Sequence, residues 1–216
     1  MPSARDPIDP DPAALPLRRT PRQTRSRQKL ARVLEAADRL LVAEGAEALT
    51  TTRVAAEAGV SVGALYQYLP DRAAIVDTLA EGYLARLETL MDSFLDRASR
   101  EIWPDPVAVL VDAFADLYRS EPGLRALWFG HHLTERTREA DRVHKHVMAV
   151  GVHRILVAQN LLPDNAAAAT ACHTAFLAAD AVIQQAFRTD ADGAADLLEH
   201  LKIMLGSYLK ALSAKP

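Results

Sequence analysis

Apolar side chains recur every three or four residues along most of the chain, which is the period of an amphipathic helix. The pattern begins at about Arg22 and continues to Glu44, where the residues that share one face are Leu30, Val33, Leu34, Ala37, Leu40 and Leu41. Segments in which Val, Ile, Thr and Tyr alternate with polar residues, as in strands, are missing. The pattern predicts an all-α protein of about nine helices.

Helix start and stop signals divide the rest of the chain. Thr50 and Ser61 are typical N-cap residues, and they predict short helices that end at about Ala58 and Tyr68. The turn between these two helices, 59–61, has the length found in a helix-turn-helix. Gly45 stands where a helix C-terminus often needs a left-handed residue. Further helices are predicted over 71–100, 105–119, 120–131, 134–160, 163–188 and 192–212, with Asp71, Asp105 and Ser120 as N-caps of the first three.

The short helix over 62–68 carries two large amphipathic rings in a run of small residues. At about 100° per residue, Leu65 and Leu69 share the inward face, and Tyr66 and Tyr68 fall on opposite flanks. The outward strip between the two rings consists of Gly63, Ala64 and Gln67.

A helix with this arrangement fits the major groove of DNA. Its small residues let it approach base edges, and each phenol hydroxyl can reach a phosphate on a groove wall. Gln67 can pair with adenine, and Val62 or Ala64 can touch a thymine methyl group. The preceding helix offers Thr51, Thr52 and Arg53 near its N-terminus to the DNA backbone. The residues leave open the alternative that both tyrosines cap a local hydrophobic cluster.

Charge is spread unevenly along the chain, although the net charge is only −3. Residues 18–72 hold ten basic and six acidic side chains, whereas residues 73–216 hold 14 and 19. The basic excess in residues 18–72, beside an acidic remainder, indicates that this part of the chain binds a polyanion. The alternative is that the basic residues only solubilise the chain beside a disordered tail. We expect a disordered tail over 1–17, a helix-turn-helix DNA-binding domain over 18–72, and a helical ligand-binding and dimerisation domain over 73–216.

The sequence lacks motifs for catalysis or for metals. There is no glycine-rich phosphate loop, no Cys-x-x-Cys and no His-Glu-x-x-His, so we predict no enzyme activity, no cofactor and no metal. Six of the seven histidines lie between His131 and His173, and we assign them to the surface or the core. Because Cys172 is the single cysteine, an internal disulfide is excluded. No apolar run of membrane-spanning length is apparent, so we expect a cytoplasmic protein without a membrane partner.

The segment ALTTTRVAAEAGVSVGALYQYLPDRAAIV, residues 48–76, resembles the N-terminal signature of the TetR family of bacterial transcriptional regulators. The shared features are a threonine that opens the second helix, the AGVS turn, Gly-x-Leu-Tyr, a second aromatic residue and a basic residue before the next helix. Leu69-Pro70 departs from the family, which usually has phenylalanine and a polar residue there. The resemblance implies contacts to DNA from Thr51, Thr52, Val62, Gly63, Ala64, Tyr66, Gln67, Tyr68 and Arg72, the last in the place of a phosphate-binding lysine.

The resemblance also implies a homodimer on a palindromic operator, which a small-molecule effector releases. The expected dimer interface, on the last two helices, contains Ala175, Ala178, Leu198, Leu201, Leu205 and Tyr208, unless this stripe packs within its own subunit. Candidate pocket residues, each of which could instead be core, are Phe114, Tyr118, Trp128, Phe129, Met148, His173, Phe176 and Ile183. The predicted function is a ligand-responsive repressor. The alternatives are a DNA-binding factor without an effector and an all-α enzyme.

Overall fold

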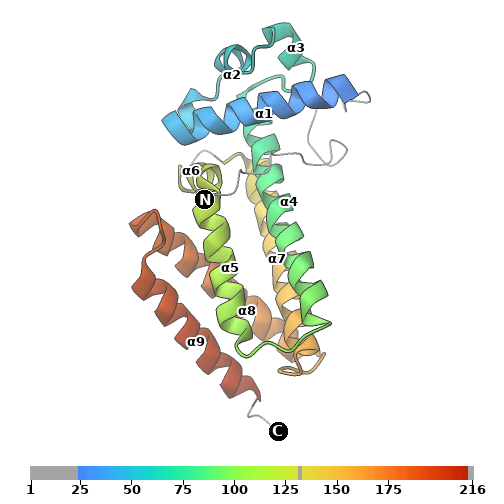
Figure 1. The fold of residues 1–216 in the computed structure, drawn as a ribbon, viewed down its shortest axis with the longest axis vertical. Coiled ribbons are helices and arrows are strands. Elements are labelled where there is room, and N and C mark those ends of the chain that lie inside the picture. Colours follow the sequence, from blue (N-terminus) through green and yellow to red (C-terminus); the bar gives the residue numbers. More distant parts are fainter. Residues whose placement is uncertain (1–23, 131–132, 214–216) are drawn as a thin grey trace. The chain divides into compact units, whose positions relative to one another are not determined.

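The computed structural model describes residues 24–130 and 133–213, which form nine α-helices, a short 3-10 helix and no strand (Figure 1). The predicted all-α class and helix count are confirmed for this part of the chain. The predicted tail over 1–17 lies outside it. The helices are α1 (Thr24–Glu44), α2 (Thr51–Glu57), α3 (Val62–Tyr66), α4 (Arg72–Ala98), α5 (Pro106–Ser120), α6 (Pro122–Phe129), α7 (Glu135–Ala158), α8 (Ala166–Thr189) and α9 (Ala195–Ser213), with η1 at Ala46–Ala48.

The chain divides into two compact units that do not follow the predicted boundary at residue 72. The first unit comprises residues up to Arg86 together with Glu121–Asp141, and the second comprises Leu87–Ser120 and the chain from Arg142 onward. Both α4 and α7 therefore contribute to each unit. The assignment of separate functions to 18–72 and 73–216 stays a prediction.

Most predicted helix starts have the expected caps. The side chains of Thr50, Ser61, Asp71 and Asp105 each accept a hydrogen bond from the backbone N–H three residues later, at 2.8–3.2 Å. Ser120 does not cap α6, because its hydroxyl donates to the carbonyl of Leu117. The helix begins instead at Pro122, whose fixed φ suits the first helical position.

The first unit is built on the apolar face of α1. All six residues predicted to share that face are buried, as are Leu49, Leu65 and Leu69 from the segments packed on it. Polar contacts hold α4 to α1 and to the start of α7. The Tyr83 hydroxyl of α4 donates to the Asp38 carboxylate of α1, and the hydroxyls of Thr134 and Thr137 donate to Asp77 of α4.

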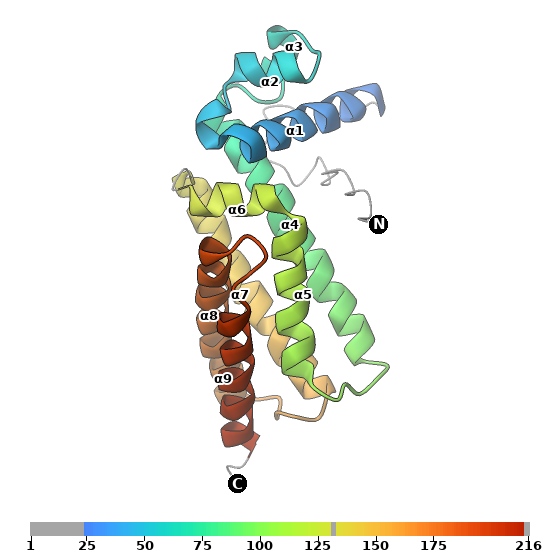
Figure 2. The same cartoon turned by 60° about the vertical axis from the view of Figure 1, so that its left-hand side comes forward.

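In the second unit α7 occupies the core, where Met148 and Ile155 are fully buried. The Gln159 side-chain amide donates to the carbonyls of Ala98 and Glu101 and accepts from the backbone N–H of Trp103, at 2.7–3.1 Å. These hydrogen bonds connect the C-terminal end of α7 to the segment that follows α4. Figure 2 shows α8 and α9 side by side.

Helix α8 corrects the expectation that no segment has the length and apolarity of a membrane span. Its many alanines make it long and apolar enough by composition, although Thr, His and Asp residues interrupt it. One such helix is weak support for membrane insertion, since core helices of other proteins meet the same criterion.

Candidate nucleic-acid interface

The two short helices α2 and α3 and the turn between them have the geometry of a helix-turn-helix. Gly59 follows α2 with φ of 63°, in the left-handed region that glycine adopts without steric cost. The Val60 N–H donates to the carbonyl of Ala55 at 3.0 Å, and Ser61 then caps α3. This local hydrogen bonding sets the direction in which α3 leaves the turn.

The outward strip of α3 is largely open, as predicted. Leu65 is 1 % exposed and holds the helix to the core, whereas Gly63 and Gln67 are exposed and Val62 and Ala64 are half-buried. A Cβ atom built on Gly63 would meet no atom within 4 Å. The strip is therefore free to approach a flat partner closely.

The prediction that Tyr68 lies on the outward flank is wrong. The helix ends at Tyr66, so Tyr68 follows it in the chain with its side chain only 8 % exposed. Tyr66 is 43 % exposed. The two rings therefore belong to different environments, and the alternative reading of a local hydrophobic cluster is correct for Tyr68 alone.

A hydrogen bond connects Tyr66 to the first residue of α2. Its hydroxyl accepts a hydrogen bond from the Thr51 hydroxyl at 3.3 Å, which joins the N-terminus of α2 to the C-terminus of α3. Thr52 and Arg53 are exposed beside Thr51. These side chains form one polar edge next to the open strip of α3.

Both predicted DNA-binding arginines already have acidic partners within the first unit. Arg53 donates to Glu44 at 2.5 Å, and this hydrogen bond holds the pKa of the Glu44 carboxyl below its ordinary value. Arg72 donates to the Ala46 carbonyl at 3.2 Å and to Glu47 at 3.4 Å. Arg72 thus also fixes the short helix η1, a structural role that the sequence pattern did not reveal.

The basic residues that precede α1 or lie in its first turn are mostly outside the described structure. Arg18, Arg19 and Arg22 fall outside the described residues, and the side chains of Arg25 and Arg27 do as well. The polyanionic partner that the charge pattern indicates for this part of the chain stays a prediction.

The predicted pocket residues are divided between the two units, and their role as one pocket stays a prediction. Trp128 and Phe129 belong to the first unit, and the other six belong to the second. Met148 and Ile183 are buried core residues, Tyr118 stacks on Phe187 with ring centroids 5.3 Å apart, and the Phe114 ring meets Phe176 edge-on.

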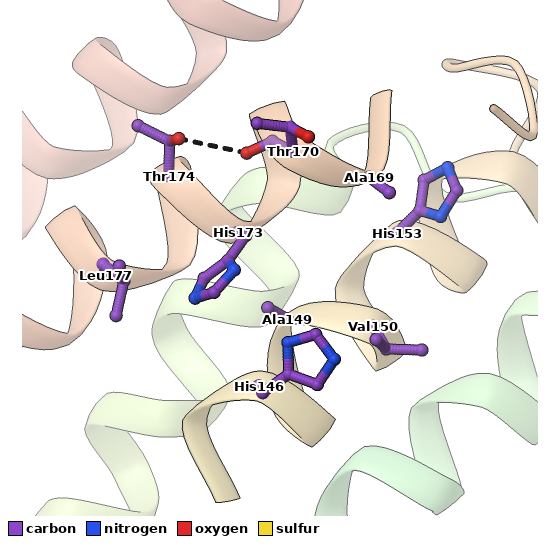
Figure 3. Close-up of a pocket in the computed structure, with 9 residues that line it drawn as sticks. All are labelled: His146, Ala149, Val150, His153, Ala169, Thr170, His173, Thr174 and Leu177. Carbon is purple, nitrogen blue, oxygen red and sulfur yellow. Dashed lines mark hydrogen bonds between the residues drawn. The ribbon is translucent and has the colours of Figure 1, made fainter. Parts of the chain in front are cut away.

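A cavity of about 290 Å³ instead lies between α7 and α8 (Figure 3). His173 is the one predicted pocket residue among its lining residues, which are His146, Ala149, Val150, His153, Ala169, Thr170, His173, Thr174 and Leu177. The histidines on one face of α7, at i and i+7, were the signal in the sequence that could have located it.

Two of the predicted dimer contacts are wrong. Leu198 and Leu201 are 4 % and 2 % exposed and pack within their own chain. Ala175, Ala178 and Leu205 are half-buried, and Tyr208 is exposed. The exposed apolar residues of α9 also include Leu197, Ile203 and Met204.

An all-α chain whose helix-turn-helix presents a small-residue strip beside threonine, tyrosine and arginine side chains has the architecture of a helical DNA-binding regulator. Comparisons with known proteins agree. Residues 33–79 match the family described as "Bacterial regulatory proteins, tetR family", and residues 101–213, more than half of the chain, match "Tetracyclin repressor-like, C-terminal domain". The chain belongs to the TetR family of DNA-binding transcriptional regulators.

Curated relatives include the nucleoid occlusion factor SlmA. The protein of that name from Vibrio vulnificus strain YJ016 is 32 % identical over 123 residues, which cover 55 % of this chain and 57 % of the relative. The one from Haemophilus ducreyi is 31 % identical over 121 residues, with the same coverage. The chain thus spans somewhat more than half the length of these relatives.

Solved structures share the fold at low sequence identity. A TetR-family regulator from Streptomyces coelicolor has a TM-score of 0.63 at 23 % identity, over 87 % of this chain and 98 % of its own. The fatty acid degradation regulator FadR from Bacillus halodurans has a TM-score of 0.61 at 14 % identity, over 85 % and 96 %. RolR in complex with resorcinol has a TM-score of 0.54 at 18 % identity, over 89 % and 96 %.

Proposed function

We propose that this regulator is a repressor that binds a palindromic operator as a homodimer and is released by a small-molecule effector. The observation that carries the DNA-binding part of the proposal is the open strip of α3. Gly63 and Gln67 are exposed there, and Tyr66 lies at the edge with its hydroxyl held by Thr51. In this arrangement Gln67 reads a base while Tyr66, Thr51 and Thr52 hold phosphates.

The short recognition helix requires symmetry. A five-residue helix offers few base contacts, so a single copy discriminates poorly between sequences. Two copies bound to half-sites one helical turn apart, roughly 34–36 Å, double the contacts and match a palindrome. The exposed apolar residues of α9, with the half-buried Ala175 and Ala178 of α8, support these two helices as the dimer face.

An effector acts in this proposal by population shift. The ligand must bind the conformer with the wrong half-site spacing more tightly than the DNA-bound conformer, or it releases nothing. By linkage, operator DNA then weakens effector binding by the same factor. RolR, which shares the fold, was solved in complex with resorcinol, and this likeness supports the effector part of the proposal.

Selection of bound duplexes from a random DNA library tests the proposal. The purified chain should enrich a palindrome, and Gln67→Ala should relax preference at one position in each half-site, at a cost of about 1–3 kcal/mol. Gln185→Ala, which changes an exposed glutamine of α8, should leave the preferred sequence unaltered. Enrichment of no sequence at low salt would refute the proposal.

A second candidate is a DNA-binding factor that needs no effector. It is favoured by the relatives that are named nucleoid occlusion factors, since that name describes no metabolite response. A screen of metabolites distinguishes the two candidates. No metabolite would change the operator affinity or the thermal midpoint of a factor that needs no effector, whereas an effector would change both for the proposed repressor.

A further inference from the structure

The cavity between α7 and α8 contains two imidazole rings that share one space. The rings of His146 and His173 have centroids 5.5 Å apart and meet edge to face at 65° (Figure 3). His146 is exposed and His173 is half-buried. Among the described residues, 24–130 and 133–213, neither imidazole ring makes a hydrogen bond to a protein atom. Their nitrogens are therefore available to a ligand in the groove.

The third histidine of the cavity, His153, already makes a hydrogen bond within the protein. The His153 Nε2 lies 3.2 Å from the carbonyl oxygen of Pro163, which can only accept, so Nε2 carries the hydrogen. His153 is 8 % exposed and forms part of the cavity wall. It has a structural role, unlike His146 and His173.

The two threonine hydroxyls that line the cavity already donate their hydrogens to backbone carbonyls. The Thr170 hydroxyl donates to the Ala166 carbonyl at 2.9 Å, and the Thr174 hydroxyl donates to the Thr170 carbonyl at 3.0 Å. His146 and His173 are thus the side chains with free N–H donors. None of the lining residues is acidic, so no carboxylate competes for these N–H groups, which suit a hydrogen-bond acceptor or an anion.

The remaining walls are apolar. Ala149 and Ala169 face the groove from α7 and α8, and Val150 and Leu177 border it while staying 44 % and 45 % exposed. The two alanines leave width for a flat ring, which the larger side chains can cover. A volume of about 290 Å³ lies at the small end of ligand sites and suits a monocyclic molecule.

We propose that this groove binds a monocyclic aromatic carboxylate. The carboxylate accepts hydrogen bonds from the ring N–H groups of His146 and His173, and the aromatic ring lies between the alanines against Val150 and Leu177. The proposal deepens the effector response above, and it rests on that response only for the consequence of binding, not for the site.

Titration of the full-length protein with benzoate, without DNA, tests the site. Calorimetry should show saturable binding, and the Cε1–H signals of His146 and His173 should shift while that of His200 stays fixed. The double variant His146→Gln/His173→Gln should bind benzoate at least about tenfold more weakly, as expected for the loss of hydrogen bonds to a charged group. His200→Gln, an exposed histidine on α9, is the matched control and should bind as the wild type does.

Two further arms complete the test. Ala169→Leu fills the groove from α8 and should abolish binding while both histidines remain. Benzyl alcohol, which has the ring without the charge, should bind at least about tenfold more weakly than benzoate. Equal binding of benzoate to the wild type and the double variant, or no saturable binding, would overturn the proposal.

An operator assay separates this inference from the proposed function. Benzoate binding that depends on the two histidines but leaves operator affinity unchanged would keep the site and remove its effector role. Failure to bind any operator without benzoate would refute the proposed repressor and leave the calorimetric result to judge the groove.

Discussion

Tyr66 and Tyr68 have the same side chain and lie two residues apart, yet they have different roles. Tyr66 ends α3 with its ring 43 % exposed and its hydroxyl bonded to Thr51. Tyr68 comes after the helix, where the chain turns inward, and its ring is 8 % exposed. The helical period placed both rings on the surface because it assumed that the helix continued to residue 68.

Phenylalanine substitutions at the two positions should therefore differ in effect. Tyr66→Phe removes the hydroxyl that the proposed function assigns to a phosphate, so operator affinity should fall by a similar factor on all sequences. Tyr68→Phe keeps the buried ring, which lies away from the open strip of α3, and should leave operator affinity unchanged. Fluorescence anisotropy on specific and non-specific duplexes measures both variants. A larger loss of affinity for Tyr68→Phe than for Tyr66→Phe would contradict the assignment.

Gly63 offers a second test at the residue scale. An added Cβ meets nothing within the chain, and alanine is the better helix former, so Gly63→Ala should stabilise the protein by up to about 1 kcal/mol. If the strip lies against base edges, the same methyl group should weaken operator binding by about 1–3 kcal/mol. Thermal unfolding and operator titration on one preparation would show the two opposite changes. Unchanged operator affinity would mean that Gly63 does not face the bases closely.

At the scale of elements, α6 packs on α1 and α4 through a glycine. A Cβ on Gly123 would lie 1.9 Å from the Tyr83 hydroxyl and 2.1 Å from an Asp38 oxygen. Tyr83 is 1 % exposed, and burial raises the pKa of its hydroxyl, which therefore stays protonated and donates to Asp38. The ion pair of Arg86 with Glu121 lies at the start of the same helix. The absence of a side chain at Gly123 is what lets α6 approach this hydrogen bond.

Gly123→Ala should accordingly destabilise the first unit. The methyl group must displace either the Tyr83 ring or the Asp38 carboxylate, and overpacking of this kind costs about 1–3 kcal/mol in the free energy of unfolding. Urea denaturation measures the loss. Gly206→Ala in α9, where an added Cβ meets nothing within 4 Å, is the matched control and should not destabilise the protein. Equal stability of the two variants would show that α6 relaxes freely.

At the scale of the whole molecule, α9 has two apolar faces, and the predicted interface combined Leu198 and Leu201 of one with Tyr208 of the other. Leu198 and Leu201 face the chain's own core. Leu197, Met204 and Tyr208 keep 36 %, 45 % and 37 % of their surface exposed. A helix that is apolar on a second, exposed face is typical of an interface between subunits.

Substitutions on the two faces should separate folding from assembly. Leu201→Ala should lower stability by about 2–5 kcal/mol through the cavity that it leaves. Met204→Asp should instead place a charge on the exposed face and convert the proposed dimer to a monomer with its helix content retained. Light scattering and circular dichroism measure mass and folding together. A Met204→Asp protein of unchanged mass would exclude this face from the proposed dimer.

The fold class, the helix count and most helix starts were determined by the sequence, because caps, glycine stops and the 3.6-residue period act locally. The same holds for the inward face of α1 and for the open strip of α3, whose residues are close in the chain. Tertiary structure alone decided the burial of Tyr68, the split of the α9 stripe, and the meeting of His146 with His173 across two helices. Each of these depends on which neighbour a side chain meets, and one helix's period can state only which residues share a face.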